Sequence, residues 1–199
     1  MPPTLRSVGE EELVERLRMK DVDAFTALVE LYHMPMVRLA LTFVPNRSVA
    51  EEVVQDTWLG VINGIDHFEE RSSLKTWMFR ILVNRARKTG ARERRTVAVD
   101  DIAATERFSP DGSWSRPPQE WTDDVVDRLF AAGVAKRLQI AIDELPPAQC
   151  QVVTLRDVER LSAREVCDIL SITEANQRVL LHRARSQLRH TIELEMEGV

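Results

Sequence analysis

Residues 161–173 read LSAREVCDILSIT. Ser162 followed three residues later by Glu165 is a capping box, in which each side chain accepts a hydrogen bond from the other residue's backbone N–H at the start of a helix. We therefore expect a short helix over 166–170, a turn over 171–173, and a longer helix that Thr173 caps. Two helices joined by such a turn form a helix-turn-helix.

The longer helix has two different sides. Its buried side is expected to hold Gln177, Leu181, Ala184, Leu188 and Ile192, with Leu180 at their edge. In the major groove of DNA, the basic side would place Arg178 and His182 near base edges, because an arginine fork matches guanine or phosphate. The candidate contacts, with the last three directed to phosphates, are Asn176, Arg178, Val179, His182, Arg183, Arg185 and Arg189. A helical hairpin with a solvated basic side is the alternative.

The composition predicts an all-α protein. Of 199 residues, 44% are hydrophobic, 6% are aromatic and seven are glycine, which suits helical packing better than a sheet sandwich. No apolar run approaches the roughly 20 residues that cross a bilayer, so we expect a cytoplasmic protein without membrane insertion. Cys150 and Cys167 lack close partners at zinc spacing, so we expect no metal site and buried structural thiols.

The charge is unevenly distributed along the chain. The formal net charge is −5, yet residues 71–95 carry nine basic side chains against one acidic. Such a segment attracts a polyanion, although a solvated basic face is the other interpretation. With the basic side of the C-terminal helix, the chain offers two basic surfaces separated by an acidic stretch, which predicts two separate contacts with DNA.

Three amphipathic helices are predicted in the first half of the chain. The first covers residues 23–43. The second begins at Ser48, which forms a capping box with Glu51, and its apolar stripe includes Ile62. The third begins near Leu74, and opposite its apolar side it presents a polar and basic side made of Thr76, Arg80, Asn84 and Arg87.

The pattern predicts two small helical domains. Residues 96–121 lack helical periodicity and contain clusters of proline, glycine and serine, so we expect a flexible acidic linker between domains at 1–95 and 122–199. In the second domain, a helical pattern runs from about 122 to Leu145. Pro147 is then placed to open a helix that reaches Asp157.

These motifs, in this order, resemble the extracytoplasmic-function subfamily of bacterial RNA polymerase sigma factors. Residues 50–58, AEEVVQDTW, resemble the polymerase-docking motif of the family's region 2. Residues 74–84, LKTWMFRILVN, are similar to the part that opens and reads the minus-10 promoter element. Residues 145–147, 161–166 and 182–185 resemble region 4, which reads the minus-35 element.

The resemblance implies a transcription-initiation factor, not an enzyme, that needs no cofactor. It implies that Glu52, Gln55 and Asp56 face the clamp helices in the largest subunit of the polymerase core, with Trp58 in the protein's own core. The loop over 63–73 would receive a flipped base of the promoter DNA. An anti-sigma protein is a further implied partner. The residues implied in minus-10 binding are Asn63, Lys75, Thr76, Arg80, Asn84, Arg87 and Lys88.

The sequence departs from the family on the recognition helix. Gln177, Arg178 and Leu180 stand where a small or β-branched residue, a lysine and an arginine are common, which leaves the promoter preference open. A helix-turn-helix regulator that binds an operator as a dimer, without polymerase, is the alternative function. Co-migration with core polymerase distinguishes the two. The sequence shows no Gly-rich phosphate loop or carboxylate pair near a histidine, so catalysis is not expected.

Overall fold

The computed structural model describes residues 9–97 and 135–197. Every regular element in these two ranges is helical and none is a strand, which confirms the all-α prediction. The predicted linker lies largely outside the described residues, as do residues 122–134 of the helical pattern that follows it. The N-terminal unit contains α1 (Glu10–Arg18), α2 (Val22–Leu41), α3 (Arg47–Gly64), the 3-10 turn η1 (Ile65–His67) and α4 (Leu74–Val97); the C-terminal unit contains α6 (Ala135–Asp143), α7 (Pro147–Val153), the π-helical turn η2 (Thr154–Val158), α8 (Ala163–Leu170) and α9 (Glu174–Glu197).

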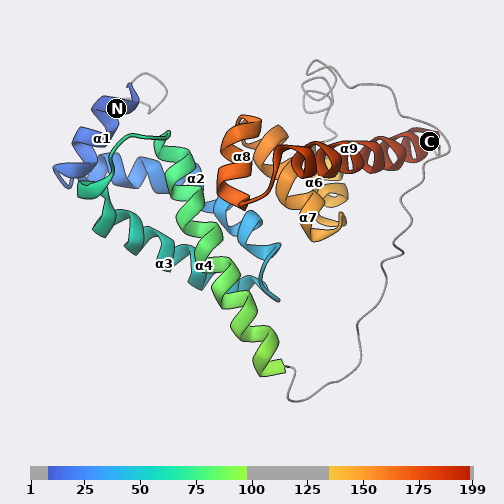
Figure 1. Cartoon of the computed structure of the whole chain (residues 1–199), viewed down its shortest axis with the longest axis horizontal. Coiled ribbons are helices and arrows are strands. Elements are labelled where there is room, and N and C mark those ends of the chain that lie inside the picture. The colour runs from blue at the N-terminus through green and yellow to red at the C-terminus, as the bar shows by residue number, and fades with distance from the viewer. Residues whose placement is uncertain (1–8, 98–134, 198–199) are drawn as a thin grey trace.

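Helices α2, α3 and α4 pack together as the body of the N-terminal unit, and α1 packs on α2 at one end (Figure 1). Their apolar residues recur every three or four positions, so each helix turns one side inward. The fully buried side chains include Leu28, Met36, Phe79 and Leu82. This packing holds the apolar side of α4 in the core, so that its polar side faces away from α2 and α3.

Both tryptophans of this unit pack against the core, as predicted for Trp58. Trp58 is buried, and its ring meets Phe25 edge to face at 5.7 Å between centroids. Trp77 is half-buried against the core and lies 5.0 Å from the ring of Phe68. Neither indole is therefore a free surface for stacking on a base.

The start of α3 differs from the prediction. The helix is capped by Asn46, whose side chain accepts a hydrogen bond from Val49 N at 3.0 Å, and Ser48 lies within the first turn. Glu51 pairs instead with Arg47 at 2.8 Å. The predicted Ser48 capping box is wrong because asparagine, an equally good cap, lies two residues earlier.

The helix-turn-helix prediction is confirmed in the C-terminal unit. Ser162 Oγ accepts from Glu165 N at 3.3 Å, and Glu165 Oε2 accepts from Ser162 N at 2.8 Å, which completes the capping box of α8. Ser171 then turns the chain in the left-handed region, with φ 51°. Thr173 Oγ1 accepts from Asn176 N at 3.2 Å and caps α9. The short helix starts at Ala163, earlier than the predicted residue 166.

Helix α7 begins at Pro147, as predicted, but ends before Asp157. Residues 154–158 form a π-helical turn instead. Glu159 N closes this turn by a hydrogen bond to Thr154 O at 2.8 Å. The extra residue in the π-helical turn sets the direction in which the Asp157 and Glu159 side chains point. Asp157 pairs with Arg185, and Glu159 pairs with Lys75.

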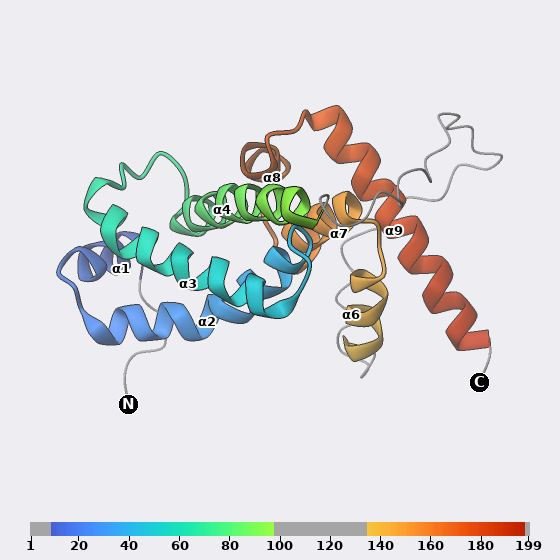
Figure 2. The ribbon, with the colours of Figure 1, turned by 90° about the horizontal axis from the view of Figure 1, so that it is seen from below.

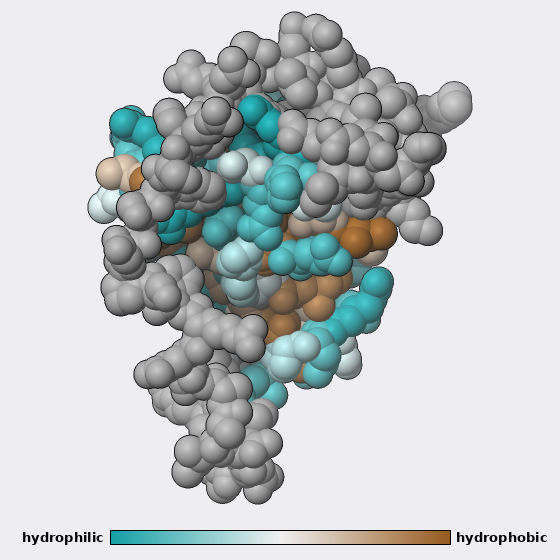
Figure 3. Space-filling view, turned by 90° about the vertical axis from the view of Figure 1, so that its right-hand side faces the viewer, coloured by the Kyte–Doolittle hydropathy of each residue, from teal (hydrophilic) through white to brown (hydrophobic). Residues whose placement is uncertain are grey.

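The two units lie against each other through α4 and α8. Figure 2 shows α8 beside α4, on the side away from α2. The end of the molecule at the right of Figure 1 shows hydrophobic side chains among hydrophilic ones (Figure 3). No helix in the described ranges is long and apolar enough to span a membrane.

Candidate nucleic-acid and polymerase interfaces

Helix α9 has the two sides predicted from its sequence. Gln177 is 1% exposed and lies with buried Leu181, Ala184 and Leu188 on the inner side. Asn176, Arg178 and His182 are exposed on the outer side, and Val179 is 47% exposed beside them. Arg178 makes a 3.1 Å ion pair with Glu174, both well exposed. Because exposed pairs of this kind contribute little, the guanidinium is available to another anion.

The phosphate candidates on α9 differ in their surroundings. Arg185 makes two hydrogen bonds to Asp157 of η2, at 2.9 and 2.7 Å, and both side chains are largely buried. This pair holds α9 on the π-helical turn, so Arg185 is committed within the unit. Arg183 and Arg189 are half-buried, and Arg189 also interacts within the chain. The exposed DNA-binding candidates on α9 therefore lie between Asn176 and His182.

Helix α4 presents its basic side unevenly. Arg80, Asn84 and Lys88 are exposed, and Asn63 is exposed at the end of α3. The structure adds Arg85, which sequence reasoning missed. Its guanidinium lies over α3, 3.9 Å from the Asp56 carboxylate. Arg85, Lys88 and Arg92 line one cavity of about 650 Å³ between the two helices together with Asp56, Thr89 and Ala91.

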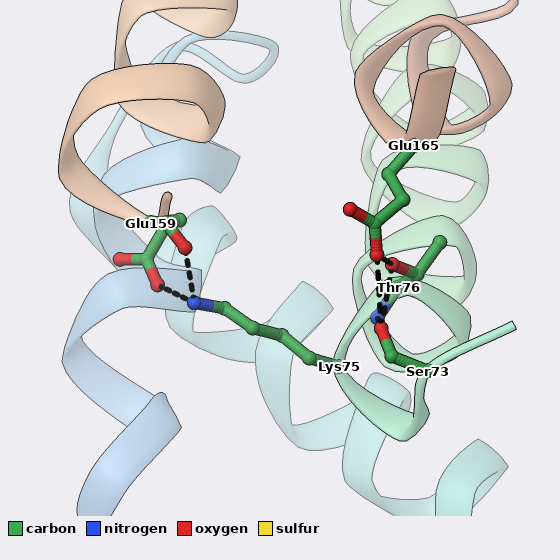
Figure 4. A network of polar contacts seen from close by, with 5 residues as sticks. All are labelled: Ser73, Lys75, Thr76, Glu159 and Glu165. Carbon is green, nitrogen blue, oxygen red and sulfur yellow. Dashed lines mark hydrogen bonds and ion pairs between the residues drawn. The ribbon is translucent and has the colours of Figure 1, made fainter. Parts of the chain in front are cut away.

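Three other candidates on α4 are covered by the C-terminal unit. Thr76 is 1% exposed, and its hydroxyl donates to Glu165 Oε1 at 2.6 Å. Lys75 Nζ lies 2.8 Å from a carboxylate oxygen of Glu159 (Figure 4). Arg87 donates to the backbone carbonyl of Leu170, the last residue of α8. The expectation that Thr76 and Arg87 lie on an open polar surface is wrong for this structure.

The Glu165 carboxylate lies between two helix starts. Burial raises its pKa, but hydrogen bonds from the Thr76 hydroxyl, the Ser162 backbone and side chain and the Ser73 hydroxyl outweigh burial and lower the pKa to about 2. Ser73 Oγ donates to the same oxygen as Thr76, at 3.1 Å. The carboxylate is therefore ionised at neutral pH and strongly hydrogen-bonded on both sides of the contact.

Helix α3 presents an acidic and apolar outer side. Glu52, Gln55 and Asp56 are exposed there. Leu59 and Ile62 are 58% and 43% exposed, so Ile62 is not part of the buried stripe predicted for it. These five residues recur at helical spacing and form one surface, which we call the α3 outer face. The exposure of Leu59 and Ile62 was not predicted, because their spacing fits the edge of the buried apolar side of α3 as well as its exposed side.

The described residues hold no group of three or more histidine, cysteine, aspartate or glutamate side chains suited to a metal ion. Cys150 is buried, as predicted, and burial raises the pKa of its thiol to about 11. Cys167 is half-exposed, unlike the prediction. The chemistry available on these surfaces is hydrogen bonding and charge pairing.

Two family models match the two units separately. The model for sigma-70 region 2 matches residues 28–96, which run from α2 through α4. The model for sigma-70 region 4 matches residues 135–188, which include the helix-turn-helix. Together they cover more than half of the chain, in the order that the sequence predicted.

Similar proteins carry the same identification. The ECF RNA polymerase sigma-E factor of Haemophilus influenzae is 26% identical over 185 residues, which cover 92% of this chain and 95% of that protein. The ECF RNA polymerase sigma factor SigG of Mycobacterium tuberculosis is 30% identical over 176 residues, which cover 82% of this chain and 47% of that protein, so this chain spans about half its length.

A solved structure has the same fold. The sigma factor RpoE of Bartonella quintana, solved in complex with the anti-sigma factor NepR, aligns with a TM-score of 0.58 at 20% identity. The alignment covers 85% of this chain and 96% of that one. The chain belongs to the extracytoplasmic-function sigma factors, which are non-enzymatic factors of transcription initiation.

Proposed function

We propose that the chain divides its work as a sigma factor among three surfaces: the α3 outer face binds core polymerase, α4 and the preceding loop bind the minus-10 element, and α9 reads the minus-35 element. The observation that carries this assignment is the separation of charge. The α3 outer face holds Glu52 and Asp56, whereas the exposed sides of α4 and α9 hold arginine, lysine and amide side chains. The phosphate backbone of DNA attracts the basic surfaces and repels the acidic one, so we assign the acidic surface to a protein partner.

The α3 outer face fits a helical protein surface that is both basic and apolar. Exposed Leu59 and Ile62 supply apolar area beside the carboxylates, and buried apolar contacts ringed by polar ones are typical of protein interfaces. We assign this surface to the clamp helices of the largest polymerase subunit.

The minus-10 surface combines residues 63–73 with the exposed side of α4. The sequence predicted a loop over this whole range, but residues 63–67 are the end of α3 and the turn η1, so only 68–73 form a loop. A flipped base needs a shaped site to offset its loss of stacking, and phosphates need cations nearby. Arg80, Asn84 and Lys88 are exposed and can contact the DNA strand. We add Arg85 to this group because it lines the cavity beside α3 together with Lys88.

The minus-35 surface is the exposed start of α9. In a helix-turn-helix, the N-terminal residues of the second helix contact base edges in the major groove. Arg178, His182 and Asn176 occupy these positions, with Val179 placed for apolar contact to a thymine methyl group. Arg183 and Arg189 are assigned to phosphates.

The proposal includes two folding units, at 1–95 and 122–199, with a linker at 96–121. It also includes an anti-sigma protein as a partner, since the Bartonella quintana structure was solved with one. The chain would act in the cytoplasm, where polymerase and promoter DNA meet. Limited proteolysis of the free chain is expected to cut first within 96–121; first cuts within 50–90 would contradict the domain boundary.

The assignment of α4 is tested by replacing Arg80 and Asn84 with alanine. Both side chains are exposed, so the double variant is expected to fold and to co-migrate with core polymerase in gel filtration. Permanganate footprinting of thymines should then show no opened promoter. Loss of core binding, or normal opening, would contradict the assignment.

A further inference from the structure

Helix α1 is bonded to both ends of the loop over 68–73. Its first residue, Glu10, accepts a hydrogen bond from Leu74 N at 2.7 Å, and its last residue, Arg18, donates to the Phe68 carbonyl at 2.7 Å. We propose that α1 sets the shape of this loop, so that Arg18 and Glu10 are positioning residues for recognition of the flipped minus-10 base. The inference rests on the proposed role of the loop in binding promoter DNA.

Helix α1 is anchored independently of these two bonds. Val14 and Leu17 are buried and belong to the hydrophobic core. The helix rises about 12 Å between its first and last residues. Figure 1 shows it beside the chain that leads from α3 to α4, and it also contacts the turn η1. A packed helix that is bonded to both ends of a loop fixes the distance between those ends.

The Arg18 guanidinium is directed toward the loop by its own helix. One terminal nitrogen, Nη1, donates to the Glu15 carboxylate at 3.0 Å. The other, Nη2, donates to the Phe68 carbonyl and lies 3.0 Å from the Glu70 carboxylate. Arginine suits this place because its planar fork presents several donors in fixed directions. The side chain therefore joins α1 to the loop through both a backbone group and a side chain.

The backbone of Glu70 explains why the loop needs this contact. Its φ is 55°, in the left-handed region that residues other than glycine seldom adopt. Such a conformation persists only where the surroundings hold the residue, and it is found most often at functional sites. In this loop, the ion pair with Arg18 connects the residue to a packed helix. We therefore expect the loop to lose its shape when Arg18 is replaced.

The other end of the loop is fixed at the start of α4. The first N–H groups of a helix have no partner within that helix, and Glu10 supplies one to Leu74, the first residue of α4. Phe68 and Leu74 are both buried, and the Phe68 ring packs against Trp77. Residues 69–71 between these ends are exposed. The ends of the loop are thus held by the protein while its middle can meet DNA.

The role in base recognition is tested with core polymerase bound to the Arg18→Met protein, because methionine keeps the apolar stem and removes the guanidinium. The ligand is a single-stranded minus-10 oligonucleotide from a promoter that the wild-type complex transcribes. A second oligonucleotide lacks the one base whose removal weakens wild-type binding most. Stacking of one base contributes about fivefold to 150-fold in affinity. The variant should bind the intact strand about tenfold more weakly and the abasic strand as the wild type does.

Arg16 supplies the matched control on the same helix. Its guanidinium pairs with Asp21, the cap of α2, at 2.8 Å, and its side chain is 27% exposed against 28% for Arg18. Arg16→Met should therefore bind both oligonucleotides as the wild type does. Glu10 is exposed, so Glu10→Ala is expected to fold; it releases the other end of the loop and should repeat the Arg18→Met pattern. All three variants should co-migrate with core polymerase.

The shape of the loop is followed in the chain alone by hydrogen exchange of the Phe68 amide, measured by NMR. This amide donates to the Ile65 carbonyl at 3.1 Å, where the loop begins. Because hydrogen bonds to a charged group contribute about tenfold or more to a local equilibrium, its exchange should rise about tenfold in Arg18→Met. In Arg16→Met the exchange rate of this amide should stay at the wild-type value.

Four results would overturn the inference: unchanged affinity of Arg18→Met for the intact strand, an equal loss for the abasic strand, an equal loss in Arg16→Met, or unchanged exchange of the Phe68 amide in Arg18→Met. The exchange measurement uses neither polymerase nor DNA. A chain that shows the expected exchange but never binds core polymerase would therefore refute the proposed function, while the contact of α1 with the loop would stand.

Discussion

Gly90 of α4 is the position where the N-terminal unit should tolerate a side chain least. A Cβ placed there would lie 2.2 Å from the backbone oxygen of Phe43 and 3.2 Å from its carbonyl carbon. Alanine favours a helix over glycine by about 1 kcal/mol, which opposes the clash. The clash is with backbone, which cannot swing aside, and overpacking of this kind costs about 1 to 3 kcal/mol or more. We expect Gly90→Ala to lower the free energy of unfolding by about 2 kcal/mol.

Gly60 of α3 provides the matched control. A Cβ there would lie 2.8 Å from Arg85 Nη2 and 3.4 Å from Ile81 Cγ2. The close atom is the far end of a flexible side chain, so Arg85 can move, and Gly60→Ala should be neutral or stabilising by up to about 1 kcal/mol. The assay is urea unfolding followed by helical circular dichroism. Equal effects of the two substitutions, or a Gly90→Ala protein as stable as the wild type, would refute the close approach of α4 to Phe43.

Two further predictions concern the polar contacts of the C-terminal unit. The fold lowers the pKa of Glu165, so the carboxylate contributes to stability above pH 4.5, its ordinary pKa, and this contribution is lost as the pH falls through about 2. The difference in urea midpoint between the wild type and Glu165→Gln should therefore shrink as the pH falls over this range. A difference that grows would contradict this prediction. Asp157→Asn breaks the largely buried pair with Arg185 and should cost about 2 kcal/mol, measured by the same unfolding assay. Glu174→Gln, which breaks the exposed pair with Arg178, should cost less than about 0.5 kcal/mol, and equal losses would show that burial does not decide the value of these pairs.

Local patterns predicted the helices and the helix-turn-helix well. The Ser162 capping box, Pro147 at the start of α7 and the buried place of Gln177 each depend on neighbours within a few positions. Such signals are written in the sequence itself, since a cap or a helix side involves residues three or four apart. The Ser48 cap was wrong because two acceptable caps lie two residues apart.

Contacts between distant residues could not be predicted in this way. Thr76 and Glu165 are far apart in the sequence, and nothing in the pattern around either indicates that the other will cover it. The bond from Leu74 N to Glu10 Oε1, at 2.7 Å, is of the same kind, as one helix supplies the cap of another. The exposed side of α4 was therefore predicted too large: its polar residues were recognised, but not the unit that covers some of them.

As a sigma factor, this chain is proposed to bind core polymerase through the α3 outer face and then to open promoters. Transcripts made from genomic DNA by core polymerase plus the protein would supply a promoter. The measurement is then co-migration with core in gel filtration, followed by permanganate footprinting, for the wild type and for a variant with Glu52→Lys and Asp56→Lys. Like charges facing a basic partner cost several kcal/mol, so the wild type should bind and open the promoter while the variant does neither. Unchanged binding and opening by the variant would contradict the docking assignment, and a wild-type protein that never binds core would contradict the proposed function.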